Sequence, residues 1–251
     1  MVSLSWLRRA SFSLMVVGCL ALSLVSSPAP SFSKCTECPS EHRSDSPPST
    51  AEGRLIAPST SSDSVYVRQQ TSKLKTHFDE IKKWDENEIE PQLTKRFKVS
   101  MGERTKGSTV LCVGARLGGE VRAFKNLGAL AVGIDMNPGL ENNFVLHGSA
   151  TSLQFASGLF DIVYTNILDH IDDLALFFEE SKRVLRQDGM LMIDVDQNPK
   201  DEWAVRDLRG EIPKFIKTLE IAGFSLLSDE IVLDEKDKGK HALIFALSEK
   251  V

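Results

Sequence analysis

Glycines and one acidic residue stand at a spacing that suits the binding of a nucleoside. The apolar run 109–113 leads into a loop that contains Gly114, Gly118 and Gly119, and a helical pattern starts directly after it. Glycine in such a turn lets a ligand approach the backbone at the N-terminus of the helix. About 20 residues later a second apolar run ends in Asp135, where such folds place an acid for ribose hydroxyls. This pair predicts a nucleoside-type ligand, although both features also occur for structural reasons alone.

The elements that would carry these residues alternate between strand and helix up to the C-terminus. Strands are predicted at 109–113, 130–135, 144–147, 160–165, 189–195, 224–233 and 240–248. Helices are predicted at 118–127, 172–186 and 211–222. Alternation of this kind is typical of a mostly parallel sheet that is covered by helices on both faces.

Five segments in this region point to a known family. They read V-L-C-V-G-A-R-L-G-G-E-V, A-V-G-I-D, G-S-A-T-S-L-Q-F, F-D-I-V-Y-T-N-I-L-D-H and R-V-L-R-Q-D-G-M-L-M-I-D. Together they resemble class I S-adenosylmethionine-dependent methyltransferases, most closely the type 11 methyltransferase domain, over roughly residues 110–195. The first loop is also similar to that of membrane-anchored plant proteins with an A-R-L-G sequence. The resemblance implies an α/β, Rossmann-like three-layer sandwich with a seven-stranded, mostly parallel sheet and an antiparallel last strand. It also implies S-adenosyl-L-methionine as the cofactor.

The resemblance implies roles at the methionine end of that cofactor. Val113, Gly114 and Gly118 would line the methionine part, and Asn166 would lie near its amino group. Arg116 stands where the family usually has glycine, so it would pair with the cofactor carboxylate, crowd the cofactor or point to the surface. These three alternatives stay open.

At the adenosine end, Asp135 would bind the ribose hydroxyls and Met136 would lie against adenine. Ser149 and Ala150 would lie at the adenine edge. Ser149 replaces the usual Asp there, and Cys112 replaces an acid that the first strand usually carries. Losing an acceptor for the adenine amino group costs about 1–2 kcal/mol.

His170, beside Asp169, follows the fourth predicted strand, at the face where the methyl acceptor should lie. Histidine has a suitable pKa for a general base, so we take the two residues as catalytic candidates. The alternative is a polar residue at the start of the next helix. Methyl transfer does not demand such a base, because the sulfonium methyl is already activated and the protein mainly positions the acceptor. No metal site is predicted, since acidic loops at strand ends are commonly solvated.

The N-terminal part of the chain has a different composition. Arg8 and Arg9 precede 16 uncharged residues, 10–25, so residues 1–33 are interpreted as a signal anchor or a cleaved signal peptide. Residues 34–64 are rich in Ser and Pro and are predicted to be a disordered stem. Its Cys35 and Cys38 suit a stem disulfide or two free thiols better than zinc, which would need a fourth ligand.

Helical periodicity begins next, so residues 65–104 are predicted as N-terminal helices, broken near Pro91. Their expected apolar faces consist of Leu74, Phe78, Ile81 and Trp84, followed by Leu93, Phe97 and Met101. Residues 105–251 would form the methyltransferase domain. If the first segment is an anchor, its arginine pair places this domain on the non-cytosolic side of a membrane.

The net charge and the composition limit the classes of binding partner that we expect. The net charge is −5, and no basic stripe with interleaved aromatics occurs, which argues against nucleic acid. We expect a methyltransferase that acts on a small molecule, lipid or glycan, either membrane-anchored or exported. Two alternatives are a non-catalytic binding protein that keeps the fold and, less favoured, a dinucleotide-dependent oxidoreductase. Against the second stands the absence of a separate hydride-acceptor domain.

Overall fold

The computed structural model describes residues 61–140, 142–196, 204, 207–208, 210–233 and 239–248. The predicted anchor, most of the predicted stem, Cys35 and Cys38 lie outside these residues. In the described part of the chain, no helix combines the length and the apolar character that crossing a membrane requires.

One seven-stranded sheet organises the domain, in the order β3-β2-β1-β4-β5-β7-β6. The first five strands are parallel, and β7 is antiparallel to both of its neighbours, which confirms the predicted fold class. The strands are β1 (Thr109–Val113), β2 (Leu130–Asp135), β3 (Val145–His147), β4 (Phe160–Thr165), β5 (Leu185–Asp196), β6 (Phe224–Leu233) and β7 (Gly239–Leu247).

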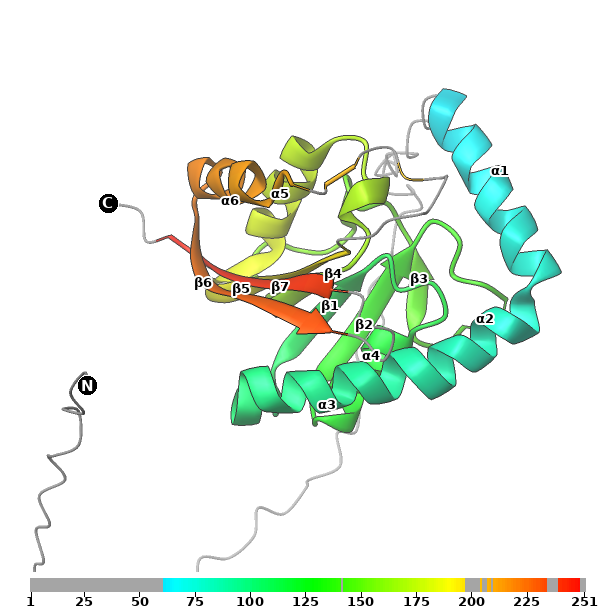
Figure 1. The fold of residues 1–251 in the computed structure, drawn as a ribbon, viewed down its shortest axis with the longest axis horizontal. Coiled ribbons are helices and arrows are strands. Elements are labelled where there is room, and N and C mark those ends of the chain that lie inside the picture. The colour runs from blue at the N-terminus through cyan, green and yellow to red at the C-terminus, as the bar shows by residue number, and fades with distance from the viewer. Residues whose placement is uncertain are drawn as a thin grey trace, which may run out of the picture. The chain divides into compact units, whose positions relative to one another are not determined.

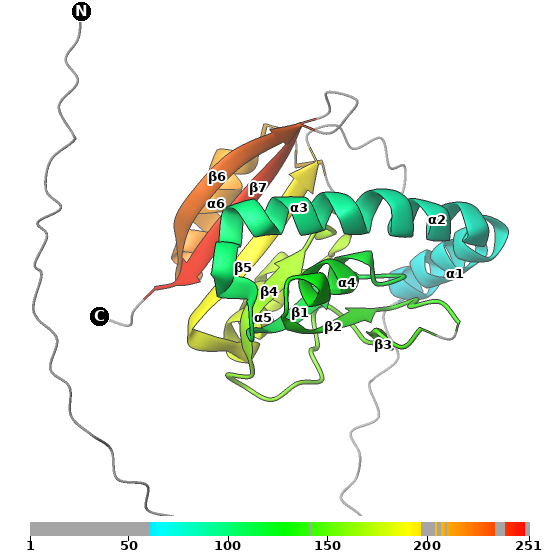
Figure 2. The ribbon, with the colours of Figure 1, turned by 90° about the horizontal axis from the view of Figure 1, so that it is seen from below.

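Helices cover both faces of this sheet, as Figures 1 and 2 show. On one face, α5 (Leu174–Val184) and α6 (Ile212–Ile221) enclose a core cluster that includes Phe177, Phe178 and Phe215. On the other face, α3 (Glu90–Met101) and α4 (Gly119–Asn126) enclose a second cluster in which Phe97 stacks on Phe124 at 4.3 Å. Alternate residues of the central strands supply the two clusters, as the two-residue period of a strand requires.

The N-terminal helices differ from the expectation in two ways. The chain forms α1 (Ser61–Thr76) and α2 (Phe78–Trp84), and then a π-helical turn (Asp85–Ile89) passes directly into α3. Pro91 therefore does not end the helix but lies in the first turn of α3, directly after the π-helical turn, where the hydrogen-bond pattern changes. The first predicted apolar face is also wrong, because Phe78 and Trp84 are exposed while Leu74 is buried.

The other boundaries lie close to the prediction. Helix α5 ends at Val184, two residues early, because β5 begins at Leu185 in register with Phe160. A short 3-10 turn (Leu168–His170) follows β4, and another (Gly102–Thr105) leads from α3 towards β1.

Candidate cofactor-binding site

The carboxyl ends of four neighbouring parallel strands bring the predicted site residues to one edge of the sheet. Val113 ends β1 between Ile134 of β2 and Thr165 of β4, and Asp135 pairs in register with His147 of β3. The segments that follow these four strand ends hold the other candidates, which are Gly114, Arg116, Gly118, Met136, Ser149, Ala150, Asn166, Asp169 and His170. The chain runs outward from β1 in one direction to β2 and β3 and in the other to β4 and β5. Open α/β sheets bind ligands at this kind of reversal.

Two glycines shape the loop between β1 and α4. Gly114 and Gly118 have φ of 81° and 88°, values that other residues rarely adopt. The amide of Gly114 donates to the carbonyl of Ile134 at 2.8 Å, which holds the loop against β2. A Cβ on Gly114 would lie 2.5 Å from the side chain of Ile167, which therefore packs directly on this glycine. No residue pattern predicts that contact, because Ile167 is one apolar residue among several in its segment.

Asp135 is held in place by the backbone and keeps acceptor capacity. One carboxylate oxygen accepts from the amide of Arg116 at 3.0 Å, and the other accepts from the amide of Asn137 at 2.6 Å. An ionised carboxylate offers about four lone-pair sites, so two remain for further donors. This arrangement fits a pair of ribose hydroxyls, and Met136 lies half-buried beside it.

The polar side chains of the turn after β3 form hydrogen bonds within that turn. Ser149 and Thr151 share a hydroxyl–hydroxyl hydrogen bond of 3.1 Å, and Ser149 also accepts from the amide of Thr151. Ala150 packs against the core cluster under α5 and α6. Ser149 therefore stabilises the turn at the position where the resemblance leads one to expect an acid.

Arg116 connects the loop to the first helix. Its φ of 36° is the one positive value among the non-glycine residues that the structure describes. Its guanidinium donates to Oε1 of Gln70 in α1 at 3.0 Å, and its carbonyl accepts from Asn142 at 2.9 Å. Gln70 is buried and Arg116 is half-buried, so the contact is partly shielded from solvent. The structure thus adds a role that the sequence did not suggest, a tie between α1 and the glycine loop.

A buried carboxylate from another helix caps α4. Asp85, in the π-helical turn, accepts from the amide of Gly119 at 3.2 Å and pairs with Arg122. Arg122 also donates to Glu90 at 2.6 Å and to the carbonyl of Leu117 at 2.9 Å. Burial raises the pKa of Asp85 and outweighs the opposing effect of Arg122. Burial lowers the pKa of Arg122, but hydrogen bonds to both carboxylates raise it overall, because Arg122 has two anionic partners and Asp85 shares one cation.

Sequence reasoning missed this network. Asp85 stands in the run D-E-N-E, which is typical of a solvated helix face, and Arg122 falls on an exposed-looking position of α4. No residue spacing predicts which helix turn will cap another one. Only the packing of the π-helical turn against α4 reveals it.

Asn166 points towards α4. Its amide donates to Oε1 of Glu120 at 3.1 Å, and Glu120 is buried in the first turn of that helix. Cys112, the residue at the usual acid position of the first strand, is a buried free thiol. Burial, followed by the charge of Glu120, raises the pKa of Cys112 well above its usual value, so the thiol is neutral and not nucleophilic.

The two catalytic candidates lie in the 3-10 turn after β4. His170 Nε2 is 3.7 Å from Asp169 Oδ2, and both side chains are largely buried. They adjoin the same carboxyl edge of the sheet as Asn166. Their catalytic role stays a prediction, since a general base could assist an acceptor hydroxyl or amine at this edge but is not required for methyl transfer.

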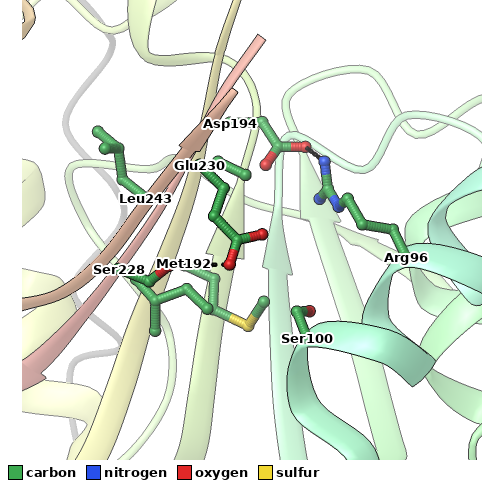
Figure 3. Close-up of a pocket in the computed structure, with 9 residues that line it drawn as sticks. Arg96, Ser100, Met192, Asp194, Ser228, Glu230 and Leu243 are labelled. Atoms are coloured by element: carbon green, nitrogen blue, oxygen red, sulfur yellow. Dashed lines mark hydrogen bonds and ion pairs between the residues drawn. The ribbon is translucent and has the colours of Figure 1, made fainter. Parts of the chain in front are cut away.

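A small pocket lies elsewhere, between α3 and the β5-β7-β6 part of the sheet (Figure 3). Arg96 of α3 pairs with Asp194 of β5 at 2.6 Å, and Tyr164 donates to the same carboxylate at 2.8 Å. The cavity of about 20 Å³ suits one water molecule rather than an organic substrate. Asp194 is thus committed to a structural ion pair. Among the described residues no group of three or more His, Cys, Asp or Glu side chains could hold a metal ion.

Comparisons with known proteins agree with this geometry. Residues 111–193 match the model of the type 11 methyltransferase domain family, while no curated protein matches the chain. The structure resembles a Burkholderia thailandensis 1,6-didemethyltoxoflavin-N1-methyltransferase solved with 1,6-didemethyltoxoflavin and S-adenosylhomocysteine. The TM-score is 0.60 at 15% identity, over 78% of this chain and 94% of that one.

Two further solved structures have related folds. One is a Methanococcus maripaludis protein described as an S-adenosyl-L-methionine-dependent methyltransferase, with a TM-score of 0.54 at 18% identity over 70% and 93% of the two chains. The other is the [4+2]-cyclase SpnF, with a TM-score of 0.50 at 16% identity over 62% and 81%. The chain therefore carries a match to the methyltransferase domain at residues 111–193, within a fold of the class I S-adenosylmethionine-dependent methyltransferase type.

Proposed function

We propose that the protein binds S-adenosylmethionine and transfers its methyl group to a small molecule, lipid or glycan. The observation that carries the proposal is Asp135, which is fixed by two backbone amides and still offers two acceptor sites at the carboxyl end of β2. It lies beside the glycine loop and within the segment that matches the methyltransferase domain. The S-adenosylhomocysteine bound to the Burkholderia protein supports the choice of this cofactor over a dinucleotide.

Different residues of this chain would bind the cofactor and assist the methyl transfer. Asp135 would bind the ribose hydroxyls, and the cofactor would lie against the glycine loop at the N-terminus of α4. Bound S-adenosylmethionine supplies a methyl group that its sulfonium already activates. The protein then has to hold the acceptor in line and exclude water. His170, with Asp169 beside it, would accept the proton that an acceptor hydroxyl or amine releases.

Two observations favour a second candidate, a protein of this fold that binds the nucleoside but does not methylate. Cys112 and Ser149 replace two acids that the family usually carries. A [4+2]-cyclase is also among the structures with a related fold. Turnover with labelled S-adenosylmethionine against a panel of acceptors separates the two candidates, because a non-methylating protein binds the cofactor without transferring the label.

Calorimetry of the full-length protein tests the cofactor assignment. We expect micromolar binding of S-adenosylhomocysteine and much weaker binding of NAD. Asp135→Ala should weaken S-adenosylhomocysteine by about 1.5–3 kcal/mol, because two hydroxyls lose a charged acceptor. The matched control is Asp188→Ala, an exposed acid at the other end of the sheet, and it should leave the affinity unchanged. Tighter binding of NAD than of S-adenosylhomocysteine would refute the proposal.

A further inference from the structure

One oxygen of a buried carboxyl group in this site has no hydrogen-bond donor among the described residues. Glu120 lies in the first turn of α4 with 7% of its surface exposed. Its Oε1 accepts from Asn166 at 3.1 Å, but its Oε2 is buried and has no hydrogen-bond partner among the described residues. Buried polar atoms of folded proteins almost always have a partner, so an orphaned carboxyl oxygen calls for an explanation.

The neighbours of Glu120 do not supply that partner. The titratable groups that act on it are Asp85 from the π-helical turn and Asp135 from β2, and its own charge acts on Cys112 of β1 and Tyr164 of β4. All four are acidic groups. Burial, and then the charges of Asp85 and Asp135, raise the pKa of Glu120 to about 8, although its own backbone and Asn166 oppose the shift. The carboxyl is therefore mostly protonated at neutral pH in the free protein.

The position of Glu120 suits a ligand. The Glu120–Asn166 hydrogen bond joins the start of α4 to the residue directly after β4, and so it links the segments that follow β1 and β4. The strand order reverses between these two strands, which is where open α/β sheets bind their ligands. Glu120 follows the loop that leaves β1, a strand that has no acid of its own, and the charge of Glu120 contributes to the raised pKa of Cys112 in that strand.

We propose that Glu120 binds the ammonium group of the cofactor's methionine end, with Oε2 as the acceptor. The inference rests on the proposed cofactor. Glu120 of α4 would supply the carboxylate that this chain lacks at Cys112. An ammonium donor would give Oε2 the partner that it lacks and would favour the ionised carboxylate. Glu120 would then release its proton to solvent as the cofactor binds, and the carboxylate–ammonium pair would carry no net charge into the buried site.

Proton release provides a test that does not depend on turnover. Calorimetry at pH 7 in two buffers with different ionisation enthalpies counts the protons released by the full-length protein. Because burial raises the pKa of Glu120 to about 8, binding of S-adenosylhomocysteine at this pH should release protons. Methylthioadenosine, which has the same nucleoside but no ammonium group, should release none. This comparison uses the wild-type protein alone and therefore does not depend on the folding of a variant.

Glu120→Gln then tests the residue itself. An amide of the same shape replaces a carboxyl group that is mostly neutral in the free protein, so the variant should fold. It should abolish the proton release and weaken S-adenosylhomocysteine about 10- to 100-fold, as expected for a lost hydrogen bond to a charged group. Methylthioadenosine should bind as before. The matched control is Glu103→Gln, which changes an exposed acid and should alter neither quantity.

The outcomes separate this inference from the proposed function. If the wild-type protein does not bind S-adenosylhomocysteine, both the function and the inference fail. If it binds, but Glu120→Gln binds S-adenosylhomocysteine as tightly as the wild type or releases the proton as the wild type does, the role of Glu120 is refuted while the cofactor assignment stands.

Discussion

The cap that Asp85 places on α4 yields a stability prediction with a calculable size. Asp85→Ala removes the acceptor for the buried amide of Gly119 and one of the two anionic partners of Arg122. Loss of a helix cap costs about 1 kcal/mol. Breaking a buried ion pair costs about 3–5 kcal/mol. The side chain of Arg122 is 21% exposed and still pairs with Glu90 in the variant, so we assign about 2 kcal/mol to the loss of its ion pair with Asp85. The free energy of unfolding should fall by about 3 kcal/mol.

Asp85→Asn separates the two contributions. The amide oxygen still accepts from Gly119, so the cap is kept, while the charge is lost. Because burial raises the pKa of Asp85, its ionised form is disfavoured in the folded protein, and removing that charge offsets part of the lost pairing with Arg122. We therefore expect Asp85→Asn to cost only about 1 kcal/mol.

Urea unfolding at pH 7, followed by circular dichroism, measures both variants. Asp79→Ala, an exposed acid on α2, is the matched control and should stay within about 0.5 kcal/mol of the wild type. Asp85→Ala should also weaken S-adenosylhomocysteine severalfold, because Arg122 holds the loop carbonyl of Leu117. A cost for Asp85→Ala below about 1 kcal/mol, or one equal to that of Asp85→Asn, would show that the cap does not support α4.

Two further predictions concern the hydrogen bond between Arg116 and Gln70 and the N-terminal segment. Arg116→Gly should leave stability nearly unchanged, because relief of a positive φ offsets the lost hydrogen bond to Gln70, but S-adenosylhomocysteine should bind more weakly in calorimetry. Gln70→Ala should weaken binding to the same extent, and stronger binding by Arg116→Gly would refute the tie. We also propose that residues 10–25 enter a membrane with the domain on its non-cytosolic side, which the flanking Arg8 and Arg9 support. Protease treatment of sealed microsomes should then leave the domain intact, and digestion without detergent would contradict the proposal.

The sheet could be predicted from the sequence because its signals are local. β1, β2, β4 and β6 begin and end at the predicted residues, and the glycine loop and Asp135 mark the edge at which a nucleoside would bind. Helices α4, α5 and α6 likewise lie within two residues of their predicted bounds.

The contacts around the loop could not be predicted, because they join segments far apart in the chain. Asp85 and Gly119 are 34 residues apart, and Gln70 and Arg116 are 46 apart. The burial of Glu120 could not be predicted either. An acid in the first turn of a helix normally lies in solvent, where it interacts favourably with the helix dipole. Its burial depends on how α4 packs against the sheet, and no sequence pattern carries that information.

The dependence of the glycine loop on α1 and on the π-helical turn has a consequence for how the protein is dissected. The family match begins at residue 111, and a recombinant fragment cut to that boundary would keep β2 to β7 and lose the first two residues of β1. It would lack Asp85 and Gln70, so α4 would lose its cap and Arg116 its anchor. Such a fragment would report an artificially weak ligand affinity, and an inactive result from it would say nothing about the whole protein. The smallest informative fragment starts at or before Ser61, where α1 begins.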